Sequence, residues 1–320
     1  MIPGGERRLE ALCGYGTAAS SAAAGLLVAI VMVRAFFSLL PPEPVAALAL
    51  STPAAVPARP DPPLVTPVPE LPRGKGMWIH RLEWAAGGDP VAVANQARAV
   101  GLTHLYLRLG SSKDGFYGQG DLDRLLPVAH AAGLKVVGWD FPYLDDPAAD
   151  AERAAAEITY TTPSGQRIDA FSADIESPQE GVNLTTAGAD AYSAKLRERA
   201  GPSYPLVATV PRPSPYKPFP YAEVVRHFDA VAPMVYWMNR DPVADVTGAI
   251  AALAPLGKPV LPVGQAYDGG PDGGPPGPPP KEAVVRFMQA ATASGATGFS
   301  FWVWQTATAD HWAAIKEAPG

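Results

Sequence analysis

The chain has 320 residues, a formal net charge of −6, and 48% hydrophobic against 18% charged residues. This composition excludes a disordered chain, and the negative charge argues against binding to a nucleic-acid backbone. Cys13 is the single cysteine, so a disulfide framework and a multi-cysteine metal site are excluded. The five histidines are scattered without the spacing of a zinc site. We therefore expect neither a metal nor another cofactor.

An uncharged apolar segment runs from Ala11 to Val33 and is long enough to span a bilayer. Arg7 and Arg8 precede it, which favours an orientation with the N-terminus inside. We expect residues 1–40 to form a signal anchor. A cleaved signal peptide is the alternative, because residues 47–49 (Ala-Leu-Ala) resemble a cleavage site. Both interpretations place the following chain outside the cytoplasm, either as a single-pass protein of the cell membrane or as a secreted one.

A proline-rich segment follows the apolar one. Residues 41–73 contain eleven prolines, which cannot sustain a helix or a central strand. The composition predicts an extended, semi-rigid extracytoplasmic linker.

Residues 74–320 have the length typical of a (β/α)8 barrel, about 250 residues. Short apolar segments alternate here with alanine-rich helical patterns. No glycine-rich phosphate loop follows the first expected strand, which argues against a doubly wound nucleotide-binding sheet. We therefore predict an α/β fold, a TIM (β/α)8 barrel, preceded by a transmembrane helix and a linker. The expected strands are Gly76–His80, Thr103–Leu109, Lys135–Phe141, Ala170–Glu176, Leu206–Pro211, Ala230–Trp237, Pro259–Ala266 and Gly298–Gln305. The expected helices begin near Pro90, Leu122, Ala148, Thr185, Tyr221, Val243, Lys281 and Ala309.

Active sites of this fold lie at the carboxyl ends of the strands. Here those ends are rich in carboxylates and aromatic rings, a combination that suits sugars. Cleavage of an acetal also needs a carboxylic acid that protonates the leaving oxygen. The aromatic residues have a simpler alternative, which is packing. The candidate substrate-binding residues are Arg108, Trp139, Asp140, Trp237, Gln265, Tyr267, Trp302 and Trp304.

The fourth expected strand carries the sharpest pattern. Ser172, Asp174 and Glu176 alternate along it and therefore share one face. Two carboxylates that lie close together repel, which raises the pKa of one of them. A raised pKa is what a general acid needs near neutral pH. The alternative is an ordinary polar strand end that is neutralised by Arg108 or Lys135.

The segment Asp169–Glu176 resembles the DGxDxDxE motif of the chitinase-like glycoside hydrolases, family 18. Asp169, Asp174 and Glu176 match the first, third and last acidic positions of that motif. Ala170 stands in place of its glycine and Ser172 in place of its second Asp.

Two further segments carry the resemblance, which covers the barrel alone. Residues 234–236 (Met-Val-Tyr) are similar to the M-x-Y of the family's sixth strand. Residues 298–302 (Gly-Phe-Ser-Phe-Trp) are similar to the G-x-x-x-W of its eighth strand. The chain resembles still more closely a group of membrane-anchored bacterial proteins classed as glycosidases, a label that supplies no substrate.

The resemblance implies substrate-assisted hydrolysis. Glu176 would protonate the glycosidic oxygen and then act as a base towards water. Asp174 would orient a substrate acetamide whose oxygen attacks the anomeric carbon, and Tyr236 would hydrogen-bond that acetamide. Trp302 would form the hydrophobic floor beneath the sugar.

The sequence leaves two alternatives open. Glu176 could act as the acid with Asp140 or Asp268 as nucleophile or base, a choice that the carboxyl separation decides. Ser172, together with Trp237 at a position where the family usually has Asp, favours a catalytically inactive carbohydrate-binding barrel. Our first expectation is a monomeric extracytoplasmic glycoside hydrolase, whose partners are the membrane and a wall or environmental glycan, N-acetylated or related.

Overall fold

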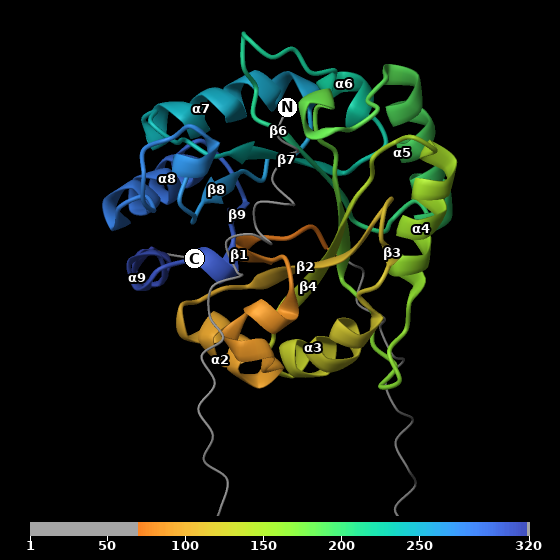
Figure 1. Cartoon of the computed structure of the whole chain (residues 1–320), viewed down its shortest axis with the longest axis horizontal. Helices are drawn as coiled ribbons and strands as arrows, with labels where there is room; N and C mark the ends of the chain where they lie inside the picture. Colours follow the sequence, from red (N-terminus) through yellow and green to blue (C-terminus); the bar gives the residue numbers. More distant parts are fainter. Residues whose placement is uncertain (1–69, 319–320) are drawn as a thin grey trace, which may run out of the picture. The chain divides into compact units, whose positions relative to one another are not determined.

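The computed structural model describes residues 70–318, and eight parallel strands of this range close into a barrel (Figure 1). The sheet order is β1-β9-β8-β7-β6-β5-β4-β2, and a pairing of β1 with β2 completes the ring. The predicted TIM barrel is thereby confirmed. The strands are β1 (Gly74–Ile79), β2 (His104–Ser111), β4 (Lys135–Phe141), β5 (Ala170–Asp174), β6 (Leu206–Pro211), β7 (Ala230–Val235), β8 (Val263–Gln265) and β9 (Gly298–Trp302).

A short strand that was not predicted, β3 (Gly115–Phe116), pairs antiparallel with the end of β2. The expected signal anchor and nearly all of the expected linker lie outside the described residues. Within residues 70–318, no helix is both long and apolar enough to cross a membrane.

One helix follows each barrel strand. The α-helices are α2 (Pro90–Ala99), α3 (Gln119–Ala131), α4 (Pro147–Thr159), α5 (Thr186–Ala200), α6 (Tyr221–Val224), α7 (Pro242–Leu253), α8 (Lys281–Ala293) and α9 (Ala309–Glu317). Short 3-10 turns, also not predicted, occupy several loops between them.

Three of these helices begin with the same dipeptide, Asp followed by Pro. Asp89, Asp146 and Asp241 each cap their helix by accepting a hydrogen bond from a backbone N–H of its first turn, at 2.8–3.1 Å. The proline that follows has no N–H to leave unsatisfied, and its fixed φ suits the first helical position. The dipeptide therefore sets the start of α2, α4 and α7.

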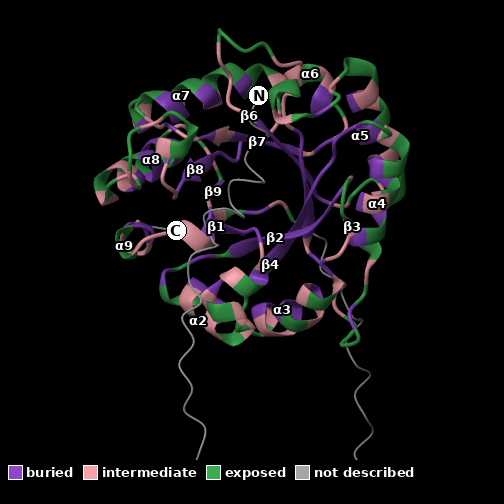
Figure 2. Ribbon diagram, in the orientation of Figure 1, coloured by how far each residue is buried: buried purple, intermediate pink, exposed green. Residues whose placement is uncertain are grey.

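Side chains of the barrel strands alternate between two environments. One set packs outwards against the helices in a continuous apolar layer, for example Leu105, Leu107 and Phe171. Figure 2 shows the strands buried and the helices exposed on their outer faces. The other set points into the barrel and includes Trp78 and Tyr106, whose rings stack with centroids 4.2 Å apart.

Several strands end earlier than the sequence predicted. β5 ends at Asp174 and β7 at Val235, so Glu176 and Tyr236 belong to the loops just beyond the ladder. β8 is reduced to Val263–Gln265, because Pro259 and Pro262 lack the N–H that a ladder needs.

Candidate active site

The acidic pair of the fourth expected strand lies at the mouth of the barrel. Asp174 is the last residue of β5 and is 7% exposed, whereas Glu176, two residues on, is half-buried. Thr209 of β6 stands beside Asp174 in the ladder, and its hydroxyl lies 2.8 Å from that of Ser172. Oδ1 of Asp174 is buried and has no hydrogen-bond partner among residues 70–318.

Burial is the largest influence on both carboxyls of the pair. It raises the pKa of Asp174 to about 7, opposed by the charge of Arg108 and reinforced by those of Asp140 and Glu180. Burial also raises the pKa of Glu176 well above its usual value, and the charges of Asp174 and Glu180 add to this. At neutral pH the pair therefore retains a proton that a general acid can donate.

Two tyrosines stand beside this pair. The rings of Tyr236 and Tyr267 meet edge to face with centroids 5.4 Å apart. Burial raises the pKa of Tyr236 well above its usual value, and the charges of Asp174 and Glu176 contribute to the rise. Both phenols remain protonated at neutral pH and can donate hydrogen bonds.

An aromatic cluster fills the barrel next to the carboxyl pair. Trp302, at the end of β9, packs edge-on against Trp139 and Trp78, with centroids 5.4 and 5.8 Å away. Trp302 is half-buried, whereas the other two rings are buried. Trp302 is thus the member of this cluster with ring surface left for a sugar.

Arg108 links this cluster to the acidic residues. Its guanidinium carbon lies 5.2 Å from the centre of the Trp139 ring, and Nη1 contacts Nε2 of His80. Burial lowers the pKa of His80 to about 4, so the imidazole is neutral at physiological pH. The positive charge near Asp174 therefore comes from Arg108.

Three predicted site residues face away from the barrel mouth. Trp237 packs against Phe287 of α8 and Trp304 against Trp312 of α9, both within the layer between strands and helices. Asp140 is fully buried, and its Oδ2 lies 2.7 Å from Nη2 of Arg153 on α4. Each of the three follows an inward-facing aromatic residue by one or two positions. Asp140 points outwards because side chains alternate along β4. Trp237 and Trp304 point outwards because β7 and β9 end before them, so strand alternation no longer applies there.

Two further candidates, Gln265 and Asp268, make hydrogen bonds that fix loop backbone. The Gln265 amide accepts a hydrogen bond from the Met238 backbone N–H at 3.0 Å and donates one to the Tyr267 carbonyl at 3.1 Å. Asp268 accepts from the N–H groups of Gly270 and Gly277, both at 2.8 Å. Gln265 thereby connects the loops that carry Tyr236 and Tyr267.

Asp169, at the first acidic position of the motif, lies at the amino-terminal end of the barrel. Asp169, which precedes β5, accepts hydrogen bonds from Lys135 at 2.9 Å and from the Val136 N–H at 2.8 Å. It also contacts His130 at 2.9 Å. Its role in the structure is to tie strands together at the amino-terminal end of the barrel.

Sequence reasoning missed four residues near the site. Trp78 and Tyr106 could have been found by applying the alternation rule to the first two strands. Glu180 and Lys217 act on the pKa of Glu176 from loops, and the sequence holds no signal for that proximity.

Comparison with known proteins gives the fold and no closer relationship. No protein-family model and no curated protein matches the chain. Among solved structures, the endo-beta-1,4-mannanase from Thermotoga petrophila matches with a TM-score of 0.58 and 13% identity, over 78% of this chain and 76% of that chain. The spore cortex-lytic enzyme SleL of Bacillus cereus matches with 0.56 and 12%, over 76% and 73%. The GH18 chitinase ChiB of Flavobacterium johnsoniae matches with 0.53 and 11%, over 77% and 93%. The chain therefore has a TIM barrel of the kind found in glycoside hydrolases of several families.

Proposed function

We propose that the protein is a glycoside hydrolase in which Glu176 is the general acid and base. The observation that carries this proposal is the Asp174–Glu176 pair, whose carboxyls both have a raised pKa at the carboxyl end of a barrel strand. Glycosidic cleavage needs a carboxyl that is protonated near neutral pH and can give up its proton. The fold shared with mannanases and chitinases is consistent with this chemistry.

The reaction that suits these residues is substrate-assisted hydrolysis. Glu176 donates its proton to the glycosidic oxygen while the substrate acetamide oxygen attacks the anomeric carbon, and the bond to the leaving sugar breaks. Asp174, whose Oδ1 accepts no hydrogen bond within residues 70–318, orients the acetamide N–H, and Tyr236 donates a hydrogen bond to the acetamide oxygen. Glu176 then takes a proton from the water that opens the ring intermediate. Trp302 supports the sugar from below.

We propose an N-acetylated glycan of a cell wall or of the environment as the substrate class. The barrel would act outside the cytoplasm, with residues 1–40 as its anchor. That part of the proposal rests on the sequence, because residues 1–69 lie outside the described range. Protease treatment of intact cells that produce the full chain tests it: the barrel should be degraded, and a protected barrel would contradict it.

The test of the reaction is the substitution Glu176→Gln in the full chain. Removal of a general acid lowers turnover by about 10²–10⁴-fold. We expect this loss in the release of reducing ends from chitin oligosaccharides or peptidoglycan fragments, with an unchanged circular dichroism spectrum. Glu198→Gln on α5, whose side chain is 72% exposed, is the matched control and should be as active as the unaltered protein.

Two outcomes would contradict the proposal. Unchanged turnover by the Glu176→Gln variant would exclude the role given to Glu176. Binding of glycans by the unaltered chain without any turnover would instead favour a carbohydrate-binding barrel. Ser172, buried and bonded to Thr209 where the family motif has a carboxylate, is the observation behind that second candidate.

A further inference from the structure

The loop after β6, the strand next to β5, lines a groove that the reaction proposed above does not use. The groove lies between the proline-rich segment 212–219, which follows β6, and the exposed side of α7, and its volume is about 510 Å³. This volume falls within the range of about 300–1,000 Å³ that is usual for ligand sites. β6 stands between β5, which ends at Asp174, and β7, which precedes Tyr236. The groove therefore begins one strand away from both.

The segment 212–219 connects the groove to the site. Lys217 lines the groove, and its charge also acts on Glu176. Phe219 and Tyr221 line it as well, with ring centroids 4.9 Å apart. Pro213 and the other prolines of this segment restrict its backbone dihedral angles, so this wall of the groove is semi-rigid. The wall thus offers a cation and two rings to a ligand that extends outwards from Glu176.

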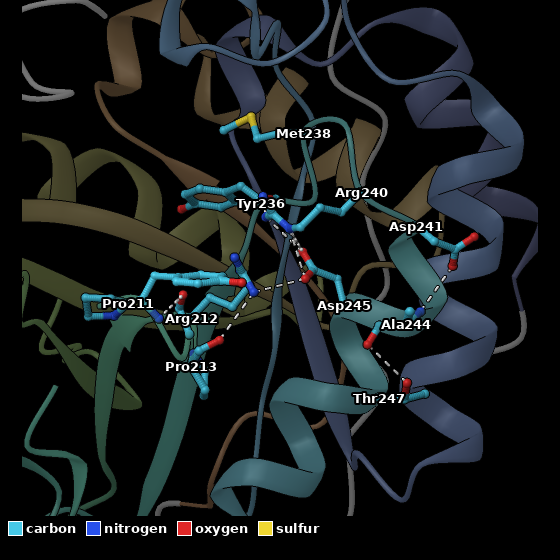
Figure 3. Close-up of polar contacts among 12 residues, drawn as sticks. Pro211, Arg212, Pro213, Tyr236, Met238, Arg240, Asp241, Ala244, Asp245 and Thr247 are labelled. Carbon is cyan, nitrogen blue, oxygen red and sulfur yellow. Dashed lines mark hydrogen bonds and ion pairs between the residues drawn. The ribbon is translucent and has the colours of Figure 1, made fainter. Parts of the chain in front are cut away.

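Arg212 of the loop segment and Asp245 of α7 bring opposite charges into the groove. Asp245 of α7 lies between two guanidiniums, 3.1 Å from Nη1 of Arg212 and 2.9 Å from Nη2 of Arg240 (Figure 3). One carboxylate faces two cations, so this trio carries a net positive charge. Among the residues that line the groove, the cations Arg212 and Lys217 outnumber the carboxylate Asp245, and the α7 side also contributes small residues such as Gly248. Arg240 binds the same carboxylate but does not line the groove.

We propose that this groove is a subsite for a sugar unit that bears a carboxylate, on a glycan bound across Glu176. The sugar ring lies against the aromatic wall, and its carboxylate is bound by Lys217 and the Arg212 side of the trio. This inference rests on the proposed function and gives it a substrate class, an acidic glycan. A uronic acid and the lactyl ether of a muramic acid both supply the carboxylate.

The experiment measures binding separately from hydrolysis. The full chain carrying Glu176→Gln is titrated calorimetrically with three tetrasaccharides that all contain N-acetylated sugars: a muramic-acid-containing peptidoglycan glycan, a glycan of alternating glucuronic acid and N-acetylglucosamine, and neutral chitotetraose. We expect one of the acidic probes to bind more tightly than chitotetraose, and its identity names the source of the carboxylate. Equal or weaker binding of both acidic probes would overturn the proposal.

Two added substitutions locate the binding. Lys217→Glu reverses a charge of the groove and should weaken the binding of the preferred acidic probe about tenfold or more. The affinity for chitotetraose should not change. Gly248→Phe places a ring in the groove, and a Cβ at this position meets no atom within 4 Å, so the helix accepts it. It should cause the same selective loss. Lys316→Glu on α9 is the matched control for charge reversal and should bind as the parent does.

The outcomes separate this proposal from the proposed function. If both groove variants bind the acidic probe as tightly as the parent, the groove is not the subsite. If the groove variants lose the acidic probe but the unaltered chain hydrolyses none of the three glycans, the subsite stands and the hydrolase proposal fails.

Discussion

Arg240 and Asp245 form a two-point ion pair, in which Nε of Arg240 lies 3.1 Å from Oδ1 and Nη2 lies 2.9 Å from Oδ2 of Asp245. The same guanidinium donates a hydrogen bond from Nη2 to the backbone carbonyl of Tyr236 (Figure 3). Asp245 is therefore a positioning residue, because it fixes the arginine that holds Tyr236.

Asp245→Asn should weaken catalysis and the fold together. Loss of the carboxylate leaves two guanidiniums facing each other, but both are partly exposed, so we expect a cost of about 1–2 kcal/mol and not the ~3–5 kcal/mol of a fully buried pair. The looser Tyr236 should lower kcat more than it raises KM. Urea unfolding and steady-state kinetics measure the two effects. Glu317→Gln, which removes a surface pair with Lys281, is the control and should change neither.

Asp174→Asn should stabilise the protein at neutral and alkaline pH while abolishing turnover. Burial raises the pKa of Asp174 to about 7, above its value in the unfolded chain, so the folded protein binds this proton more tightly. Its contribution to stability is complete below about pH 4 and is lost as the pH rises to about 7. Asparagine stays neutral throughout, and its advantage should be about 2–4 kcal/mol at pH 8 and vanish near pH 4. Thermal unfolding of both proteins across this range measures it, and a constant difference in Tm would contradict the assignment.

Two loop substitutions should move the alkaline limb of the pH–activity profile in opposite directions. The charge of Glu180 raises the pKa of Glu176, and the charge of Lys217 lowers it. Glu180→Gln should therefore shift the loss of activity to lower pH, and Lys217→Gln should shift it to higher pH. Profiles of kcat/KM from pH 5 to 10 test both. Shifts of the same sign, or none, would show that Glu176 is not the acid that limits the reaction.

Asp140→Asn should destabilise the protein while sparing the chemistry. Asp140 is buried against Arg153, whose Nη1 also lies 2.6 Å from Asp150. Burial raises the pKa of Asp140 to about 6 despite Arg153, so part of the pair's attraction is already offset by the cost of burying the charge. Because Asp150 also remains as a partner, we expect a cost of at most about 2 kcal/mol, below the ~3–5 kcal/mol for a guanidinium left alone. Urea unfolding measures the loss. A fall in kcat of a thousandfold without lost stability would instead identify Asp140 as a nucleophile.

Much of the fold could be predicted because local signals agree with it. Four predicted helix starts, Pro90, Tyr221, Lys281 and Ala309, coincide with those of the structure. Alternating apolar strands and short turns left few topologies to consider. The two-residue strand β3 was not predicted, because so short a segment carries no periodicity and its pairing with β2 depends on tertiary contact.

The site was harder to predict than the fold. Alternation along the expected strand predicted that Asp174 and Glu176 share one face, but β5 ends at Asp174 and Glu176 lies in the loop beyond it. The same rule separates Trp139, which faces inwards, from Asp140, which faces α4. A polar or aromatic residue near a strand end therefore faces the barrel mouth only if it also falls on the inward side of this alternation. The effect of the Lys217 charge on the pKa of Glu176 could not be predicted, because it depends on the path of a loop that the sequence alone does not specify.

The ammonium of Lys75, near the start of β1, donates hydrogen bonds of 2.8 Å to the carbonyls of Ile315 and Ala318 at the end of α9. These hydrogen bonds join the two ends of the described chain at the amino-terminal end of the barrel. Glu176 lies at the other end of the barrel. A fluorescent label or an immobilising support joined at either end of residues 70–318 would therefore stand clear of the entrance that substrates use.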